Sequence, residues 1–209
     1  MPLELVSGPS FEPVSLADAR RWLRLEDDDT ANTPVLRMLI KAMREYAENL
    51  THRAYVQRQY RLYAEGWPVD SDYGSRIELP FPPLASVDSV KYIDTSGTLI
   101  TLAADQYVVH AEAEPAFVLP AYNVAWPAVR AVPDAVQVVF TAGYAPGSPP
   151  DEAAVQEVLP ETLKLWMQSR MATLFENREQ IIIGTIVNAL PRDFVDGLLD
   201  NLTVGTRLF

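Results

Sequence analysis

The amino-acid sequence predicts an α+β protein, in which a bundle of long helices carries an inserted small antiparallel β-sheet or sandwich module. Two observations predict this class. Apolar residues recur at three- and four-residue steps over residues 34–50 and 160–179, which is typical of helices that bury one face. The stretch between these segments instead alternates apolar and polar residues in short runs bounded by prolines, as antiparallel strands do.

The same change of pattern divides the chain into consecutive parts. We expect an N-terminal helical part of the core at 1–55, an inserted β-module at 56–145, a C-terminal helical part at 146–201 and a C-terminal tail at 202–209.

The first part begins with an extended segment and continues into helices. Residues 1–13 carry three prolines and should form a loop or an arm. Ser15 and Asp18 have the spacing of a capping box, so a short helix should follow Ser15. The acidic run 26–29 ends that helix. It lacks the glycine and the spacing of a calcium-binding EF-hand loop, so we expect a solvated loop there.

The second helix should open at Thr33 and Pro34, a cap followed by a proline in the first turn. We expect its polar side to carry Arg37, Lys41, Arg44, Glu45 and Glu48. Its apolar face should comprise Val35, Leu36, Leu39, Ile40, Met43, Tyr46, Ala47 and Leu50.

Short alternating runs fill the middle of the chain. The turn at 95–97 contains Gly97 and predicts a hairpin between its flanking strands. The expected strands are 57–64, 76–79, 87–94, 98–102, 107–110, 116–119 and 135–141.

The last part returns to helical periodicity after a glycine- and proline-rich linker at 143–150. Residues 151–158 should add a helical turn before the long helix at 160–179. Residues 180–190 fit either a strand or a mobile loop, and a last short helix should start at Pro191. The apolar stripe of the long helix comprises Leu163, Trp166, Met167, Met171, Leu174 and Phe175.

The composition excludes several classes of function. Among 209 residues there is no cysteine, which excludes disulfides, thiol catalysis and thiolate zinc sites. The formal net charge of -11 repels duplex DNA and anionic membranes, which argues against a static nucleic-acid clamp. No apolar run approaches the length of a membrane span, and the N-terminus lacks a signal-peptide pattern. We expect no membrane association.

The residues that usually carry catalysis are scarce or scattered. The two histidines, His52 and His110, lie far apart in the sequence and lack helical spacing. Glycine-rich phosphate loops, nucleophile elbows and paired-histidine metal motifs are all missing from the sequence. We therefore expect no enzyme and no catalytic, metal or cofactor site.

A set of segments, in this order and spacing, resembles the head–tail connector (adaptor) proteins of long-tailed bacteriophages and of phage-derived gene transfer agents. The resemblance spans residues 14–200. Its segments are 14–19 (VSLADA), 22–25 (WLRL), 77–84 (IELPFPPL), 86–92 (SVDSVKY) with Asp94 and Gly97 beyond, 126–127 (WP), 133–136 (PDAV), 139–144 (VFTAGY) and 175–179 (FENRE).

The resemblance implies a helical core with an inserted β-module and a homo-oligomeric ring, usually of twelve subunits. It also implies that the ring docks on the portal in the virion neck, extends the DNA channel and offers a platform to the next neck or tail protein. The protein would be made in the cytoplasm of the host bacterium. In relatives the C-terminal end reaches into the portal. That role would fall here to Thr203, Val204, Gly205, Thr206, Arg207, Leu208 and Phe209.

Two segments each allow two interpretations. Phe175, Glu176, Asn177, Arg178 and Glu179 are either an intersubunit contact of the ring or a polar helix end with local ion pairs. The tail is either a portal-binding arm or a frayed terminus.

The function of the whole protein also has rival interpretations. Carboxylates lining a channel would let double-stranded DNA slide through without binding it, so we expect no duplex binding by the isolated protein. A rival within the neck is a stopper or tail-terminator subunit. A rival from a different class is an acidic cytosolic enzyme or ligand-binding protein with a pocket in its β-module.

Overall fold

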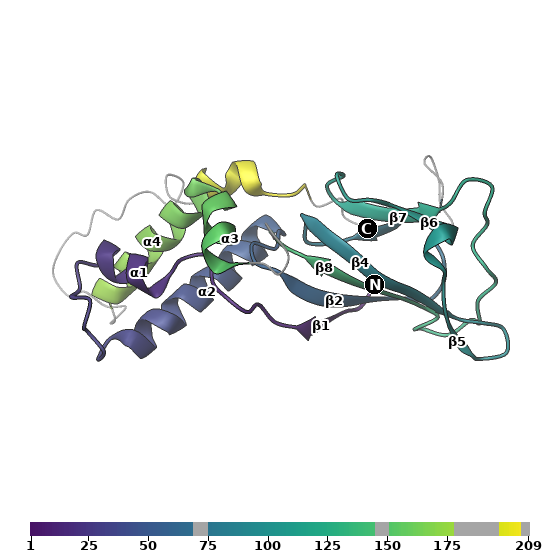
Figure 1. The fold of residues 1–209 in the computed structure, drawn as a ribbon, viewed down its shortest axis with the longest axis horizontal. Helices are drawn as coiled ribbons and strands as arrows, with labels where there is room; N and C mark the ends of the chain where they lie inside the picture. The colour runs from purple at the N-terminus through teal and green to yellow at the C-terminus, as the bar shows by residue number, and fades with distance from the viewer. Residues whose placement is uncertain (69–74, 145–150, 178–196, 206–209) are drawn as a thin grey trace. The chain divides into compact units, whose positions relative to one another are not determined.

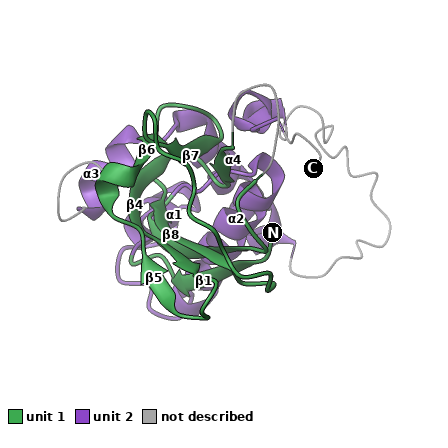
Figure 2. Cartoon of the chain, turned by 90° about the vertical axis from the view of Figure 1, so that its right-hand side faces the viewer, with its two compact units in different colours: residues 1–10, 56–145 green, residues 11–55, 146–209 purple. Residues whose placement is uncertain are grey.

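A computed structural model describes residues 1–68, 75–144, 151–177 and 197–205 of the chain. The chain forms two compact units, which Figure 2 shows in different colours. Unit 1 comprises residues 1–10 and 56–145, and unit 2 comprises residues 11–55 and 146–209.

Unit 1 contains two antiparallel sheets (Figure 1). The larger sheet has the strand order β1-β2-β8-β4-β5 and the smaller one has the order β3-β7-β6. The 3-10 turn η1 (Ala104–Gln106) leads into β6. The strands are β1 (Leu3–Ser7), β2 (Arg58–Ala64), β3 (Ile77–Leu79), β4 (Leu84–Ile93), β5 (Leu99–Thr101), β6 (Tyr107–His110), β7 (Ala116–Pro120) and β8 (Val136–Ala142).

The neighbouring strands β2 and β8 of the larger sheet each bury one face. Every second side chain of each is buried, and the register places Tyr60 opposite Phe140 and Leu62 opposite Val138. The Tyr60 and Phe140 rings stack with centroids 5.6 Å apart, and Phe81 stacks on Tyr60 at 5.4 Å. The strands β2 to β8 all overlap the segments that alternation predicted.

The end of β8 requires glycine. Gly143 has φ +116°, a backbone conformation that side chains rarely permit. A Cβ at this position would lie 2.5 Å from the carbonyl carbon and oxygen of Val56. The Gly143 amide donates to the Pro83 carbonyl at 2.9 Å, so this close approach joins the ends of β2, β4 and β8.

Unit 2 is helical. Its described elements are α1 (Leu16–Trp22), α2 (Thr33–Thr51), α3 (Glu152–Val158), α4 (Glu161–Glu176) and the 3-10 helix η2 (Gly197–Leu202). α2 and α4 lie side by side and run in opposite directions (Figure 1). The Tyr46 ring of α2 stacks on the buried Trp166 ring of α4 with centroids 5.8 Å apart. The core of this unit includes Val14, Ala19, Leu36, Leu39, Ile40, Ala47, Ala54, Tyr55, Val155, Leu159, Leu163, Trp166, Met167, Met171 and Leu199.

The prediction of a bundle of long helices is wrong, although the α+β class holds. α2 has 19 residues and α4 has 16, while α1 and α3 have 7 each. Leu159 is extended because the following Pro160 disfavours helical backbone, and this separates α3 from α4. Asn177 leaves helical backbone at φ -111°, so α4 ends before the predicted residue 179.

The start of the chain also differs from expectation. Residues 3–7, expected within a loop or an arm, form the edge strand β1, which pairs with β2. The predicted helix cap is confirmed, because the Asp18 amide donates to the Ser15 hydroxyl at 3.0 Å. Residues 180–190 and the predicted helix start at Pro191 lie outside the described residues.

Within the described ranges, none of the helices has the length and apolar character needed to span a bilayer.

Candidate functional site

The described part of the chain contains no group of three or more histidine and acidic side chains placed to hold a metal ion. The described residues also contain a buried arginine network, the root of the C-terminal tail and exposed faces of α2 and α4. All of them belong to unit 2.

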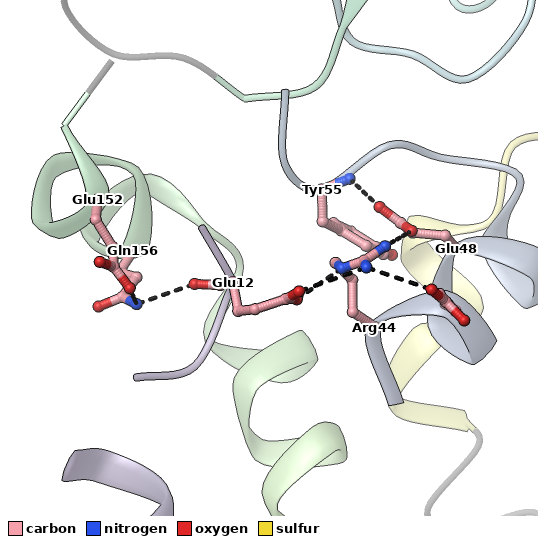
Figure 3. Close-up of polar contacts among 7 residues, drawn as sticks. Glu12, Arg44, Glu48, Tyr55, Glu152 and Gln156 are labelled. Atoms are coloured by element: carbon pink, nitrogen blue, oxygen red, sulfur yellow. Dashed lines mark hydrogen bonds and ion pairs between the residues drawn. The ribbon is translucent and has the colours of Figure 1, made fainter. Parts of the chain in front are cut away.

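The buried network centres on Arg44 of α2, which is 1% exposed (Figure 3). Its Nε donates to Glu12 Oε2 at 2.6 Å, and its Nη1 donates to Glu48 Oε2 at 2.8 Å. Glu45 lies 3.5 Å from Arg44 Nη2. The Gln156 side chain of α3 donates to the Glu12 carbonyl at 3.0 Å. One guanidinium thus connects α2 with the segment before α1, and Gln156 extends that connection to α3.

These carboxylates also set the ionisation of the arginine. Burial acts to lower the pKa of the Arg44 guanidinium, but the Glu12 hydrogen bond and the charges of Glu48 and Glu12 outweigh it. The pKa of Arg44 is therefore raised above its ordinary value, and the side chain carries a permanent charge in the interior.

The network continues to the end of α2. Glu48 Oε1 accepts from the Tyr55 amide at 3.1 Å, and the buried Tyr55 hydroxyl donates to Thr51 Oγ1 at 3.0 Å. Glu12 and Tyr55 each lie close to a point where the chain passes between the two units. Arg44 and Glu48 therefore hold both of these connecting segments against α2.

The root of the tail attaches to the same end of α2. The Val204 amide donates to the Thr51 carbonyl at 2.9 Å, and Arg53 Nε donates to the Leu202 carbonyl at 3.1 Å. The Thr203 hydroxyl donates to the Leu199 carbonyl at 3.1 Å. Arg53 is 8% exposed, so its guanidinium binds the tail root from inside the protein.

The structure describes only part of the predicted tail. Thr203, Val204 and Gly205 lie directly after η2, whereas Thr206, Arg207, Leu208 and Phe209 lie outside the described residues.

The predicted subunit-interface segment lies at the C-terminal end of α4. Phe175 is half-buried, and Glu176 and Asn177 are exposed. The Asn177 amide and side chain both donate to the Thr173 carbonyl at 3.0 Å, which caps the helix. Arg178 and Glu179 lie outside the described residues, so the structure places only the first three residues of this segment together.

Several α2 residues lie on a different side from the one that the sequence predicts. Arg44 and Glu48 are buried, although they were expected on the polar side, and Tyr46 and Leu50 are 50% and 40% exposed. The sequence did contain a signal for the burial of Arg44. Arg44 follows Ile40 by one turn and precedes Ala47 by three residues, so helical periodicity places it on the same face as these two apolar residues. Charged side chains are rarely buried, so the residue type pointed to the polar side more strongly than its position pointed to the core.

No protein-family model and no curated protein sequence matches this chain. Solved structures contain chains of similar fold. One such chain belongs to the structure of the neck of an empty gene transfer agent (GTA) particle computed with C6 symmetry, and it matches with a TM-score of 0.75 and 22% sequence identity. A second is the virion of a native GTA particle, with a TM-score of 0.74. A third is the neck of a native GTA particle computed with C12 symmetry, with a TM-score of 0.66. Each match covers 100% of this chain and 98% of the other, and the second and third also have 22% identity. The likeness shows that this chain shares their fold over its whole length.

Proposed function

We propose that the protein is a non-enzymatic structural component of a virion neck: a head–tail adaptor of a tailed phage or gene transfer agent particle. In this role it forms a ring that docks on the portal, extends the DNA channel and provides the platform for the next neck or tail protein. The observation that supports this most strongly is the similarity of fold, over the whole chain, to a chain in the neck of a GTA particle.

The charge of the protein fits a channel through which DNA slides. Each chain carries a formal net charge of -11, so a ring of such chains has a large overall excess of carboxylates. Phosphates are held by lysine and arginine side chains that displace counterions, and an excess of carboxylates opposes such binding. We therefore expect no gel shift of duplex DNA by the isolated protein at physiological salt.

The tail and the end of α4 supply the proposed contacts with neighbours. We propose that the tail from Thr203 to Phe209 binds the portal, because its apolar end is better buried on a partner than left in water. We also propose that residues 175–179 contribute to the contact between subunits. Replacing Arg178 with glutamate should weaken ring formation without unfolding the protein.

Electron microscopy of the protein mixed with the portal of the same particle tests the proposal. We expect a ring seated on the portal. Deletion of residues 206–209 should abolish attachment and leave the helical circular dichroism unchanged. Binding to a tail tube without binding to portal would instead assign the protein to the stopper or tail-terminator class.

A further inference from the structure

We propose that the tail root, which is η2 together with residues 203–205, is a strap that locks the connector between the two units. The connector is the segment 51–56, through which the chain passes from unit 2 to unit 1. A partner that holds the tail in its docked position would then restrict the motion of unit 1 relative to unit 2. Only this last step rests on the proposed function, which supplies the portal as the partner.

The connector is almost completely buried. Thr51, Tyr55 and Val56 are fully buried, and Arg53 and Ala54 are nearly so. Buried backbone groups need partners within the protein, because water does not reach them. The conformation of the connector is therefore set by the groups that cover it.

The tail root binds the turn at which α2 becomes the connector. The Val204 amide donates to the Thr51 carbonyl at 2.9 Å, and the Leu202 carbonyl accepts from Arg53 Nε at 3.1 Å. These two bonds flank His52, whose φ of 53° ends the helix in left-handed backbone. The last carbonyls of a helix have no partner within it, and here a residue near the other end of the chain supplies one.

Thr51 links the tail root to the rest of the connector. Its carbonyl accepts from Val204, while its hydroxyl accepts from the Tyr55 hydroxyl at 3.0 Å and donates to the Ala47 carbonyl at 2.8 Å. The Tyr55 amide also donates to Glu48 Oε1 at 3.1 Å (Figure 3). Loss of the Val204 bond would leave the buried Thr51 carbonyl without this donor, which favours a rearrangement of the last turn of α2. Because the same turn holds Tyr55, we expect the connector to loosen with it.

Two consecutive residues of the connector belong to different units. Tyr55 is held by Glu48 and Thr51 of unit 2. Val56 lies against Gly143, at the end of β8 in unit 1. Hinges are a few residues that absorb changes of φ and ψ, so release of Tyr55 would give the chain a hinge at this crossing.

The tail root has the properties of a segment that opens locally. Apart from the buried Leu199, its described residues are exposed or half-buried. The Thr203 hydroxyl donates to the Leu199 carbonyl at 3.1 Å, so part of its bonding lies within the root itself. Segments with few buried contacts open while the rest of the protein stays folded. We therefore expect the strap to be released without the unfolding of unit 2.

A partner acts on this equilibrium through the tail. If the portal binds the tail more tightly when the root is docked, binding shifts the root toward its docked state. The coupling is reciprocal, so a change that loosens the connector should also weaken the binding of the tail.

Hydrogen exchange of the Tyr55 amide tests the strap in the isolated protein. Val204→Pro removes the donor to Thr51, and we expect the Tyr55 amide to exchange at least about tenfold faster. Val204→Ala keeps the amide and is the matched control, with exchange as in the wild-type protein. A chain ending at Thr203 also lacks the donor and a chain ending at Gly205 keeps it, which gives a second matched pair. Unchanged exchange at Tyr55 in both proteins without the donor overturns the strap.

The reverse measurement uses the other end of the same coupling. Tyr55→Phe removes only the hydroxyl that donates to Thr51, and the Val204 amide should then exchange about threefold faster or more. Tyr63→Phe removes a hydroxyl that donates to Glu4 in unit 1 and is the matched control. Equal exchange of the Val204 amide in these two variants contradicts the coupling through Thr51.

Spin labels measure the motion of the units. The chain has no cysteine, so Lys41→Cys on α2 and Thr101→Cys on β5, both exposed, carry one label each. We expect the distribution of distances between the two labels to be broader in Val204→Pro than in Val204→Ala. Equal distributions would overturn the effect of the strap on the motion of the units.

Addition of portal separates the strap from the proposed function. Slower exchange at Tyr55 in the full chain, but not in the chain ending at Gly205, supports both. Faster exchange in Val204→Pro without any binding to portal supports the strap and contradicts the proposed function. Portal binding with unchanged exchange at Tyr55 overturns the link between partner and strap and leaves the proposed function standing. Loss of helical circular dichroism in Val204→Pro and in the chain ending at Thr203 would place the root in the core and overturn the strap.

Discussion

Arg44 Nε and Glu12 Oε2 lie 2.6 Å apart, although 32 positions separate the two residues in the sequence. This contact holds the segment that enters unit 2 against the middle of α2. Because Glu48 binds the same guanidinium from the other side, the charge of Arg44 is compensated within the interior. Removing either partner of such a buried pair destabilises the protein, because the other charge is then left in the interior without compensation.

Replacing Arg44 with methionine should lower the free energy of unfolding of unit 2 by about 3–5 kcal/mol, because it leaves the Glu48 carboxylate buried without its cation. Urea unfolding followed by helical circular dichroism measures this loss. Lys41→Met on the exposed side of the same helix is the matched control and should change little. Adding Glu48→Gln to Arg44→Met should recover part of the loss. Equal stability of the Arg44 and Lys41 variants would contradict this role.

Gly143→Ala should destabilise unit 1 by more than about 1 kcal/mol, since the backbone conformation alone disfavours alanine and its Cβ would overlap the Val56 backbone. Differential scanning calorimetry measures the shift in unfolding temperature. Gly8→Ala is the control, because nothing lies within 4 Å of a Cβ at that position. If both variants unfold at the same temperature, the backbone conformation at position 143 does not require glycine.

The Asp94 carboxyl, in the turn after β4, should make the stability of unit 1 depend on pH in the acidic range. Hydrogen bonds from the Ser96 hydroxyl and the Thr98 amide lower the pKa of the Asp94 carboxyl below its ordinary value of 3.8. A lowered folded pKa means that the stabilisation is present above the unfolded value and is lost as pH falls through the folded value. Asp94→Asn should therefore be less stable at neutral pH but lose less stability on acidification.

Melting temperatures measured from neutral to acidic pH test this expectation for Asp94. Asp134→Asn, an exposed carboxyl elsewhere in unit 1, is the control. Parallel pH curves for the wild-type protein and Asp94→Asn would show that the turn makes no acid-dependent contribution.

Arg53→Met should loosen the root of the tail while the tail itself stays intact. The Arg53 hydrogen bond to the Leu202 carbonyl involves a charged donor, and such bonds contribute about 1.5–3 kcal/mol. Hydrogen exchange of the Val204 amide, which donates to Thr51, should accelerate by about tenfold or more. Lys41→Met should leave this exchange rate unchanged. If the tail binds portal, Arg53→Met should also weaken portal binding, and only when residues 206–209 are present.

The sequence carried most of the information about unit 1, because alternation depends on immediate neighbours. In β2 and β8 each apolar position points to the same core, so the periodicity of two residues predicts both the strand and its buried face. The strand β1 escaped prediction because its partner β2 supplies the hydrogen bonds, and four of its five side chains are exposed.

Unit 2 was less predictable, since the burial of several of its side chains depends on contacts with residues far away in the sequence. The burial of Arg44 depends on Glu12, which no local pattern connects to α2. Tyr46 was expected in the core, and its ring does stack on Trp166, yet half of it remains exposed. The periodicity of α2 correctly predicted that the helix has an apolar face. It could not distinguish the apolar residues that are buried within the protomer from those that remain exposed. The tail-root contacts of Arg53 were equally invisible, because their partner lies near the other end of the chain.

The division of the chain between the two units has a consequence for its synthesis on the ribosome. Every residue assigned to unit 1 has been translated once residue 145 is added, so its sheets can form while the nascent polypeptide is still growing. α2 has been translated by then, but α3, α4 and η2 have not, so Leu36, Leu39 and Ile40 await the helix that will cover them. During this interval the hydrophobic stripe of α2 is exposed to solvent, and we expect chaperones to bind the nascent chain there.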